Sequence, residues 1–536
     1  MTDGSHGDDG RLPRAGAPLY KRFAVAGALI FCLTSGAVAT ATLMEVKELS
    51  EIIRPIGGPT EFGKDVITKA EAGDPQTILL VGSDKRFGAG KGDARSDTMM
   101  LVRLDPDQAA TAVMSVPRDL VARIPGHGRE KINGAYSYGG LNLTAKTVKR
   151  LFTDASGEPF TINHAIGVNF SGFRKVVNFL DCVFTDVDRR YYHSNDGLPA
   201  SAHYAEIDIQ PGYQRLCGQR ALDYVRFRHA DSDLVRAARQ QDFLRNAKDQ
   251  IGTSRLLDDL KPLAGIFGQS TESDRDLSTV SGVLKLVKLG AYSAGHPVRE
   301  VPFPATLVDG DPSGLGSYIT ATDAQLGRAL DEFLHAKPAI EPRSTEASRA
   351  KADKVRAKAK ALAKVRARSG RRADPRRVYA NYGLTLDRRR GEDLVAPTEA
   401  SGRLGFPMYF AKAHTRTARY PRSTKNAPSP RVYTLRDRAD KPHRAYRIVV
   451  THNELEGQYY GVQGTTWKTP PILEGLADRV RMRNRTYELR YDGKRLRTVA
   501  WRTSKATYWI SNTLSLKLSN QQMRGLARSM TKLGDA

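Results

Sequence analysis

Charged side chains flank three apolar runs near the start of the chain. The runs are Thr77–Val81, Thr98–Leu104 and Ala112–Val116, and their length and apolar content predict buried strands. The charged residues that stand just outside the ends of these runs are Asp84, Arg95, Asp97, Arg118 and Asp119. In α/β folds, ligand sites form where strands end at the rim of a sheet. Carboxylates are oxygen ligands for magnesium and arginine is a bidentate donor to phosphate, so this set suits a magnesium ion beside a phosphate group.

A second group of charged residues lies near the middle of the chain. Residues 224–229 alternate in a strand-like way, and we expect a strand that points Arg226 and Arg228 to one face. Two arginines on one face repel each other unless an anion lies between them. A helix is expected next, with three polar residues on one face: Asp233, Arg236 and Gln240. The alternative for both segments is an ordinary solvent-exposed charged face.

The order of these residues resembles the LytR-CpsA-Psr family. The motifs are Gly82-Ser83-Asp84, Arg95-Ser96-Asp97-Thr98, Val116-Pro117-Arg118-Asp119 and Lys131-Ile132-Asn133, followed by an Arg-x-Arg pair and an Asp-x-x-Arg-x-x-Arg-Gln-Gln run. The resemblance is tight over residues 76–250 and continues more loosely to residue 338. One departure is Asp181-Cys182-Val183, because many members carry two glycines before the valine.

The resemblance implies a membrane-anchored phosphotransferase with an α/β/α sandwich fold. Family members move a glycopolymer, such as teichoic acid or capsule, from a polyprenyl-pyrophosphate carrier to peptidoglycan, and an apolar cavity holds the lipid tail. Carried over to this chain, the ligands of Mg²⁺ (or Mn²⁺) are Asp84 and Asp97. The implied pyrophosphate ligands are Arg95, Arg118, Arg226, Arg228, Arg236 and Gln240. Arg95, Arg118 and Asp233 are the implied catalytic residues, and both Asp233 and Asp119 are candidates for the general base. A pyrophosphatase side activity is a further expectation.

Two other functions fit parts of the sequence. A non-catalytic protein that binds polyprenyl phosphate or the cell wall would keep the arginines, but Asp84 and Asp97 argue against it. A transcriptional regulator needs a DNA-binding module, for which the expected cytoplasmic tail of 22 residues is too short. Zinc chemistry is disfavoured because the chain has no CxxC pair and no HExxH motif.

The N-terminal segment predicts a single membrane span. Residues 1–22 are polar and end in Lys21 and Arg22, and Phe23–Met44 then runs for 22 residues without a charge. At the helical rise this run is about 33 Å long, which is enough to cross a bilayer. We expect an uncleaved signal anchor with the N-terminus in the cytoplasm and the rest outside the cell. Cleavage at Ala39-Thr40-Ala41 is the competing prediction. Either arrangement excludes chromosomal DNA as the partner.

The remaining chain divides by composition. We expect a juxtamembrane spacer over 45–75, a catalytic domain over 76–338, a basic linker over 339–376 and a small β-sheet-plus-helix accessory domain over 377–536. Lys and Arg number 84 against 58 Asp and Glu, a net charge of +26, and Arg343–Arg377 alone contributes 14 basic and 3 acidic residues. Such a tether suits anionic lipid or an anionic wall polymer, or it is a spacer without a partner.

Several local features are expected within these domains. Helices are predicted at 141–152, 170–180 and 520–533, and the accessory domain is predicted to contain a hairpin turn at Asp492-Gly493. Cys182 and Cys217 are the only cysteines outside the predicted span, so oxidising surroundings favour a disulfide between them. Two buried free thiols are the alternative.

Overall fold

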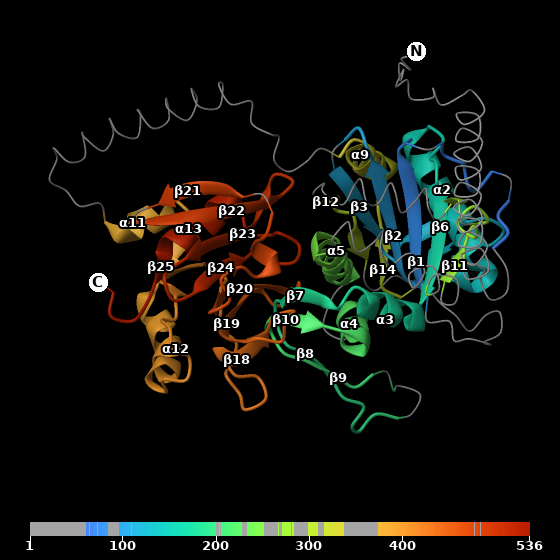
Figure 1. The fold of residues 1–536 in the computed structure, drawn as a ribbon. Coiled ribbons are helices and arrows are strands. Elements are labelled where there is room, and N and C mark those ends of the chain that lie inside the picture. The colour runs from blue at the N-terminus through green and yellow to red at the C-terminus, as the bar shows by residue number, and fades with distance from the viewer. Residues whose placement is uncertain are drawn as a thin grey trace, which may run out of the picture.

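The computed structural model describes residues 60–83, 96–227, 233–250, 271–282, 298–308, 316–336 and 374–535, apart from a few positions inside these ranges. Figure 1 shows two globular parts, which we call the N-terminal domain (60–336) and the C-terminal domain (374–535). The predicted span Phe23–Met44 and most of the basic linker lie outside the described residues. Within the described ranges, no helix combines the length and apolar character needed to cross a membrane.

The N-terminal domain is built on a mixed six-stranded sheet in the order β11-β6-β1-β2-β3-β12. The strands β1, β2 and β3 are antiparallel neighbours, whereas β6 runs parallel to β1 and β12 runs parallel to β3. The three strands predicted from the apolar runs are therefore confirmed. The bounds are β1 (Gln76–Ser83), β2 (Ser96–Asp105), β3 (Ala110–Val116), β6 (His164–Asn169), β11 (Thr271–Ser273) and β12 (Val298–Glu300).

Helices cover both faces of this sheet. Leu79 and Val81 of β1 belong to a core shared with α2 and α9, whereas Ile78 and Leu80 belong to the opposite core, which includes Leu244 of α5. Alternate residues of a strand point to opposite faces, so this division means that the layers are helix, sheet and helix. The expected helix at 141–152 lies inside α2. The bounds are α2 (Gly134–Ser156), α9 (Asp323–Leu334) and α5 (Asp233–Gln250).

Residues N-terminal to β1 also pack on this domain. Val66 is buried in the core with α2 and α9, and Thr68 donates its amide to the carbonyl of Ile162 at 2.8 Å. The part of the expected spacer that the structure describes therefore contacts the domain.

Two shorter helices follow the sheet strands. The predicted helix at 170–180 is confirmed as α3 (Phe170–Phe179), which begins where Asn169 accepts a hydrogen bond from the amide of Gly172. The strand predicted at 224–229 is wrong, because residues 224–226 form the end of α4 (Gly218–Arg226). Ala221, Leu222 and Val225 recur at helical spacing and are buried, and this pattern outweighs the two-residue alternation.

Small antiparallel pairs surround the main sheet. The pair β7–β10 forms a two-stranded ribbon that extends toward the C-terminal domain in Figure 1. The pairs are β4 (Val121–Ile124) with β5 (Gly128–Lys131), β7 (Val183–Val187) with β10 (Gly212–Leu216), β8 (Tyr191–His193) with β9 (Ile207–Ile209), and β13 (Thr306–Val308) with β14 (Tyr318–Thr320).

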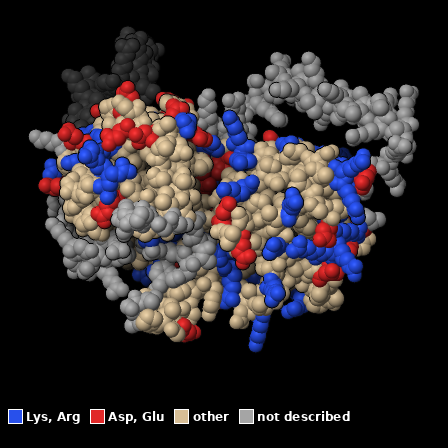
Figure 2. Space-filling view, turned by 180° about the vertical axis from the view of Figure 1, so that it is seen from behind, with Lys and Arg blue, Asp and Glu red and all other residues tan. Residues whose placement is uncertain are grey.

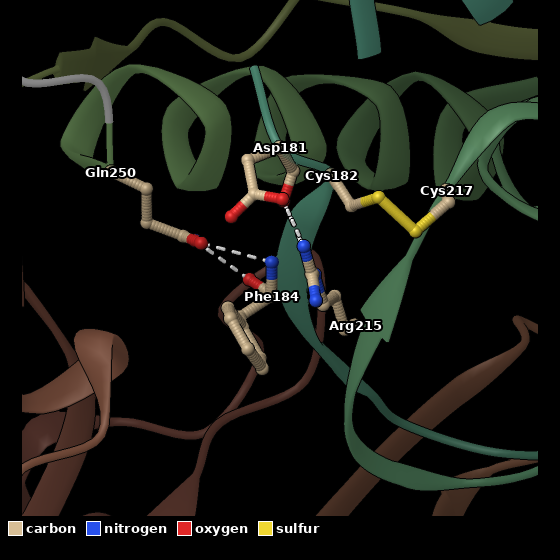
Figure 3. Close-up of a disulfide and its surroundings, with 6 residues drawn as sticks. All are labelled: Asp181, Cys182, Phe184, Arg215, Cys217 and Gln250. Atoms are coloured by element: carbon tan, nitrogen blue, oxygen red, sulfur yellow. Dashed lines mark hydrogen bonds and ion pairs between the residues drawn. A yellow bond between two sulfur atoms is a disulfide. The ribbon is translucent and has the colours of Figure 1, made fainter. Parts of the chain in front are cut away.

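A disulfide closes the base of the β7–β10 ribbon. Cys182 and Cys217 are joined with an S–S distance of 1.99 Å, and Arg215 forms an ion pair with Asp181 beside them (Figure 3). Asp181 and Cys182 have φ angles of 59° and 65°, the left-handed region that favours glycine. These are the positions where many family members carry glycine. Each left-handed residue costs about 1–2 kcal/mol, and the ion pair and the disulfide hold this turn in place.

The C-terminal domain contains a seven-stranded antiparallel sheet in the order β18-β19-β20-β24-β23-β22-β21. The predicted hairpin turn at Asp492-Gly493 joins β22 to β23, and Gly493 has a positive φ of 52°. The strands are β18 (Arg431–Arg436), β19 (Pro442–Asn453), β20 (Gln458–Thr465), β21 (Asp478–Met482), β22 (Arg485–Asp492), β23 (Arg495–Arg502) and β24 (Thr507–Ser511).

Helices and two small strand pairs complete this domain. The last helix is shorter than predicted: α13 ends at Ser529, and Met530 and Thr531 then pair with Phe410 and Ala411. That pairing needs extended backbone, so the helix cannot continue to residue 533. The remaining elements are α11 (Pro375–Ala380), β15 (Leu384–Leu386), α12 (Arg388–Ala400), β16 (Phe410–Ala411), β17 (Ala413–Thr415), η2 (Pro471–Leu473), α13 (Asn520–Ser529) and β25 (Met530–Thr531).

The positive charge of the chain is concentrated in its C-terminal part. Residues 374–536 contain 32 Lys and Arg against 14 Asp and Glu, a formal net charge of +18. Figure 2 shows Lys and Arg side chains spread over much of the visible face of this domain. The basic excess therefore extends well beyond the linker.

Candidate functional site

The strand ends that carry the predicted site residues meet at one rim of the sheet. Ser83, the last residue of β1, pairs with Ser96, the first residue of β2, and also with Asn169, the last residue of β6. Val116, at the end of β3, pairs with Met99 near the start of β2. The segments that contain the first three motifs therefore leave or enter the sheet at the same edge. Asp84, Arg95 and Arg228 lie outside the described residues, and so do the side chains of Asp97 and Asp233.

Arg118 and Asp119 occupy this rim just after β3. Arg118 Nε lies 3.4 Å from Asp119 Oδ2, and Lys131 Nζ lies 3.7 Å from Asp119 Oδ1. The amide of Asn133 donates to the carbonyl of Arg118 at 3.1 Å. The two motifs that contain these residues are thus neighbours in space, and the Asp119 carboxylate lies between two cations. Their attraction orients Arg118 and Lys131 toward the same carboxylate.

Arg226 reaches the same rim from the end of α4. Its Nη2 donates to Asp223 Oδ1 at 2.9 Å, and its Nε donates to the same oxygen at 3.2 Å. The guanidinium carbon lies 5.3 Å from the ring centroid of Phe170, the residue that follows β6. A guanidinium stacked on a ring and held by a carboxylate has little freedom to reorient. A cation in the last turn of a helix is also favoured by the helix dipole.

Helix α5 brings the second charged group to the first. Gln240 Nε2 donates to Thr98 Oγ1 at 2.8 Å and to the carbonyl of Val225 at 3.1 Å. This amide therefore links α5 to both β2 and α4. Arg236, one turn earlier on the same helix, is only 4% exposed. The structure thus places Arg118, Arg226 and Gln240 at the same rim, and Arg236 is buried one turn before Gln240 on α5.

Several residues at the rim were missed by the sequence reasoning. Asp223 accepts a hydrogen bond from Arg226, three residues further along α4. Residues at this spacing are neighbours on a helix, so predicting a helix here would have indicated this ion pair. Tyr136 donates to Ser83 Oγ at 3.2 Å, and it also lies 3.3 Å from Glu272 Oε2. Glu272 belongs to the short strand β11, whose place beside β6 has no clear sequence signal.

The chain neighbours of the expected metal ligands lie at this rim. Asp84 follows Ser83 directly, and Asp97 follows Ser96, the register partner of Ser83. Two carboxylates from adjacent strand ends are a donor set suited to Mg²⁺. Among the side chains that the structure describes, no three His, Cys, Asp or Glu residues gather as a metal site.

Comparisons with known proteins extend these observations. The model of the LytR_cpsA_psr family matches residues 45–325. The polyisoprenyl-teichoic acid–peptidoglycan teichoic acid transferase TagT of Bacillus subtilis (strain 168) is 30% identical over 216 residues, which are 40% of this chain and 64% of TagT. The regulatory protein MsrR of Staphylococcus aureus (strain COL) is 32% identical over 197 residues, which are 36% of this chain and 54% of MsrR. The chain thus spans less than two thirds of the length of these relatives.

Solved structures give similar matches. One titled "TagT bound to LIIa-WTA" is 25% identical with a TM-score of 0.38, and the match covers 52% of this chain and 97% of that one. The TagT structure with bound octaprenyl pyrophosphate lipid is 23% identical with a TM-score of 0.36, covering 52% and 97%. The family model covers more than half of the sequence. The chain therefore belongs to the LytR-CpsA-Psr family.

Proposed function

We propose that this chain transfers a glycopolymer, teichoic acid or a similar polymer, from a polyprenyl-pyrophosphate carrier to peptidoglycan. The observation that supports the proposal is that Arg118, Arg226 and Gln240 lie at one rim, with Arg236 buried one turn before Gln240 on α5. The name of the relative TagT describes such a transfer, and one TagT structure holds octaprenyl pyrophosphate. The basic C-terminal domain suits an anionic polymer, because opposite charge raises the local concentration of a polyelectrolyte.

The arrangement supplies charge stabilisation and positioning. A pyrophosphate repels an incoming sugar hydroxyl, and fixed guanidinium groups offset that repulsion while they hold the phosphorus in line. Arg226 is fixed by Asp223 and Phe170, and the Gln240 amide is fixed by Thr98, so little reorganisation accompanies binding. Asp84 and Asp97 would hold Mg²⁺, which would neutralise further phosphate charge.

Asp233 is our proposed general base for the acceptor hydroxyl. Asp119 is the other candidate, but its carboxylate already lies between Arg118 and Lys131. Protonation of Asp119 would remove the charge that orients both cations. We therefore assign Asp119 to positioning. The proposal also keeps the chain in the cell membrane as a single-pass protein, with its N-terminus in the cytoplasm and its domains outside.

The test is transfer of a polyprenyl-pyrophosphate-linked teichoic acid to peptidoglycan by the purified full chain, with EDTA as the metal control. Arg226→Ala should lower transfer and binding of octaprenyl pyrophosphate together, by about 10- to 150-fold for one charge-assisted contact. Arg226→Lys should not restore them, because a lysine cannot form the bidentate fork.

Arg190→Ala is the matched control for this test. Arg190 also makes a two-nitrogen contact with a carboxylate, that of Asp208 in β9, but it directly precedes β8 and is not among the rim residues. Equal loss in both variants would contradict the site assignment. A wild-type chain that binds the lipid without any transfer would make it a non-catalytic binding protein.

A further inference from the structure

Helix α5 is polar on all sides and yet buried. Seven of its charged or amide side chains belong to residues that are less than 10% exposed: Arg236, Arg239, Gln240, Gln241, Asp242, Arg245 and Asn246. Buried polar groups need partners, since an unsatisfied one costs free energy. In Figure 1, α5 stands between the sheet of the N-terminal domain and the C-terminal domain. Its partners therefore come from both.

The first half of α5 is held by the N-terminal domain. Arg239 donates to the carbonyl of Phe227, and its guanidinium carbon lies 4.7 Å from the centroid of the Tyr191 ring. Gln240 makes the two hydrogen bonds to Thr98 and Val225 described above. These contacts join the helix to the rim of the candidate site.

The second half is held by the β22–β23 hairpin of the C-terminal domain. Arg245 Nη2 lies 2.9 Å from Asp492 Oδ2, and the Asp492 side chain is 1% exposed. Arg497 forms an ion pair with Asp242 and donates to Asn246 Oδ1 at 3.3 Å. Two oppositely directed ion pairs thus connect one helix to one hairpin, and both are largely removed from water.

The tip of this hairpin also contacts β12. The amide of Glu300 donates to Asp492 Oδ1 at 3.4 Å, and Arg299 Nη1 lies 3.9 Å from the same oxygen. A β-carbon at Gly493 would lie 1.3 Å from Arg299 Nη1, so any other residue would require the Arg299 side chain to move. Glu300 in turn forms an ion pair with Arg245. The Asp492-Gly493 turn is therefore inserted between α5 and the edge of the main sheet.

We infer that the C-terminal domain is a positioning element for the transferase site, and that Asp492 acts as a positioning residue through Arg245 of helix α5. The inference rests on the proposed function. Along the helix, Asp242 lies two residues beyond Gln240 and six beyond Arg236, which correspond to axial distances of about 3 Å and 9 Å. A helix transmits a constraint over such distances because its backbone hydrogen bonds are continuous. Fixing Asp242 and Arg245 therefore fixes the rotation that aims Gln240 at Thr98.

The ribbon β7–β10 connects the C-terminal domain to the candidate site at a second place. Asp186 of β7 accepts hydrogen bonds from Arg447, and β10 leads through Cys217 directly into α4, the helix that ends at Arg226. Both helices of the second charged group are thus attached to the C-terminal domain. The family model ends at residue 325, so this domain lies beyond the segment that defines the family.

The test compares two variants of the full chain with wild type. Asp492→Asn keeps the size of the side chain and removes its charge. Arg497→Met removes the partner that the hairpin gives to Asp242, which keeps its contacts to Arg245 and Asn246 within α5. We expect each to lower kcat for polymer transfer at least about tenfold, equivalent to about 1.4 kcal/mol in the barrier. Hydrogen exchange at the backbone amides of residues 240–250 should become at least tenfold faster. Arg497→Lys should retain most of the wild-type kcat and amide protection that Arg497→Met loses, because lysine keeps the positive charge.

The matched control is Glu456→Gln. Glu456 belongs to the same domain and pairs with Lys517 at 3.4 Å, but both side chains are about half exposed. Activity is measured well below the unfolding midpoint and is divided by the concentration of folded protein. A variant that merely folds less completely then shows no decrease in kcat. A purely structural role would leave this corrected kcat at the wild-type value, and that result would overturn the inference. Faster exchange in α5 without loss of kcat would overturn it as well.

The proposed function and the inference fail in different ways. If the wild-type chain binds octaprenyl pyrophosphate but transfers no polymer, the proposed function falls. The inference is then judged by amide exchange and by the affinity for octaprenyl pyrophosphate. Because Arg236 and Gln240 are proposed to contact the pyrophosphate, Asp492→Asn should weaken this affinity. Should Asp492→Asn not fold, Arg497→Met and Arg497→Lys give the same comparison at a less buried position.

Discussion

The ion pair between Asp186 and Arg447 offers a direct measure of how strongly the two domains are joined. Arg447 Nη1 lies 2.9 Å and 3.1 Å from the two carboxylate oxygens, and Trp509 Nε1 donates to Asp186 Oδ2 at 3.1 Å. The Arg447 side chain is 0% exposed and that of Asp186 is 7% exposed. Aromatic side chains surround the pair, among them Phe184 and Tyr213. Water cannot replace the carboxylate as the partner of this guanidinium.

Asp186→Asn removes the charge and keeps the shape of the side chain. Loss of one partner from a buried ion pair costs about 3–5 kcal/mol, because the other charge stays buried without compensation. We expect the denaturant midpoint of the full chain to fall accordingly. Tryptophan fluorescence is the probe, since all three tryptophans belong to the C-terminal domain and Trp509 contacts Asp186 itself.

Two further variants make this prediction refutable. Glu456→Gln, which breaks the exposed pair with Lys517, should cost no more than about 1 kcal/mol. Combining Asp186→Asn with Arg447→Gln should cost less than the sum of the two single changes, because the double variant leaves no unpaired charge. If Asp186→Asn is as stable as Glu456→Gln, Arg447 is compensated elsewhere and our reasoning about the junction is wrong.

Three more outcomes are expected. Arg118→Ala should weaken binding of octaprenyl pyrophosphate by about 10- to 150-fold, measured by titration, whereas Asp97→Ala should abolish the Mg²⁺ dependence of transfer and leave lipid binding in place; full Mg²⁺-dependent activity of Asp97→Ala would refute the metal assignment. Burial and nearby Arg390 lower the pKa of His414 from 6.5 to about 4, so the unfolded state binds the extra proton first and stability falls as the pH drops from 6.5 to 4. The loss from this group is about 3 kcal/mol, and a His414→Gln variant should lack that part of the pH dependence in urea titrations. Breaking the disulfide by a Cys182→Ala, Cys217→Ala double change should cost roughly 3–4 kcal/mol in thermal unfolding, and an unchanged midpoint would contradict that estimate.

Elements with a strong local pattern could be predicted from the sequence. Strands β1, β2 and β3 are apolar runs bounded by glycine or charge, and α3 has an apolar stripe at helical spacing. Residues 224–226 were misread because their alternation fits a strand over three residues, whereas the helical spacing is visible only when Ala221 and Leu222 are included. Short windows leave the two periods indistinguishable.

Contacts between distant segments could not be predicted. The motifs indicate which residues belong to the site, but the pairing of Ser83 with Ser96 and Asn169 depends on the order of strands in the sheet. Asp186 and Arg447 are 261 residues apart in the sequence. The apolar residues around each of them indicate only that each lies in a buried strand. A pattern predicts which face of an element is buried and not which partner covers it.

The junction formed by Phe184, Tyr213, Trp509 and their neighbours has a practical consequence for anyone who shortens this protein. A chain that stops before the C-terminal domain would present the aromatic side chains of β7 and β10 to solvent. It would also leave the outer edges of this two-stranded ribbon without cover. Exposed apolar surface beside open strand edges is a template for aggregation. The family segment alone would therefore be prone to precipitate at concentrations at which the full chain stays dispersed.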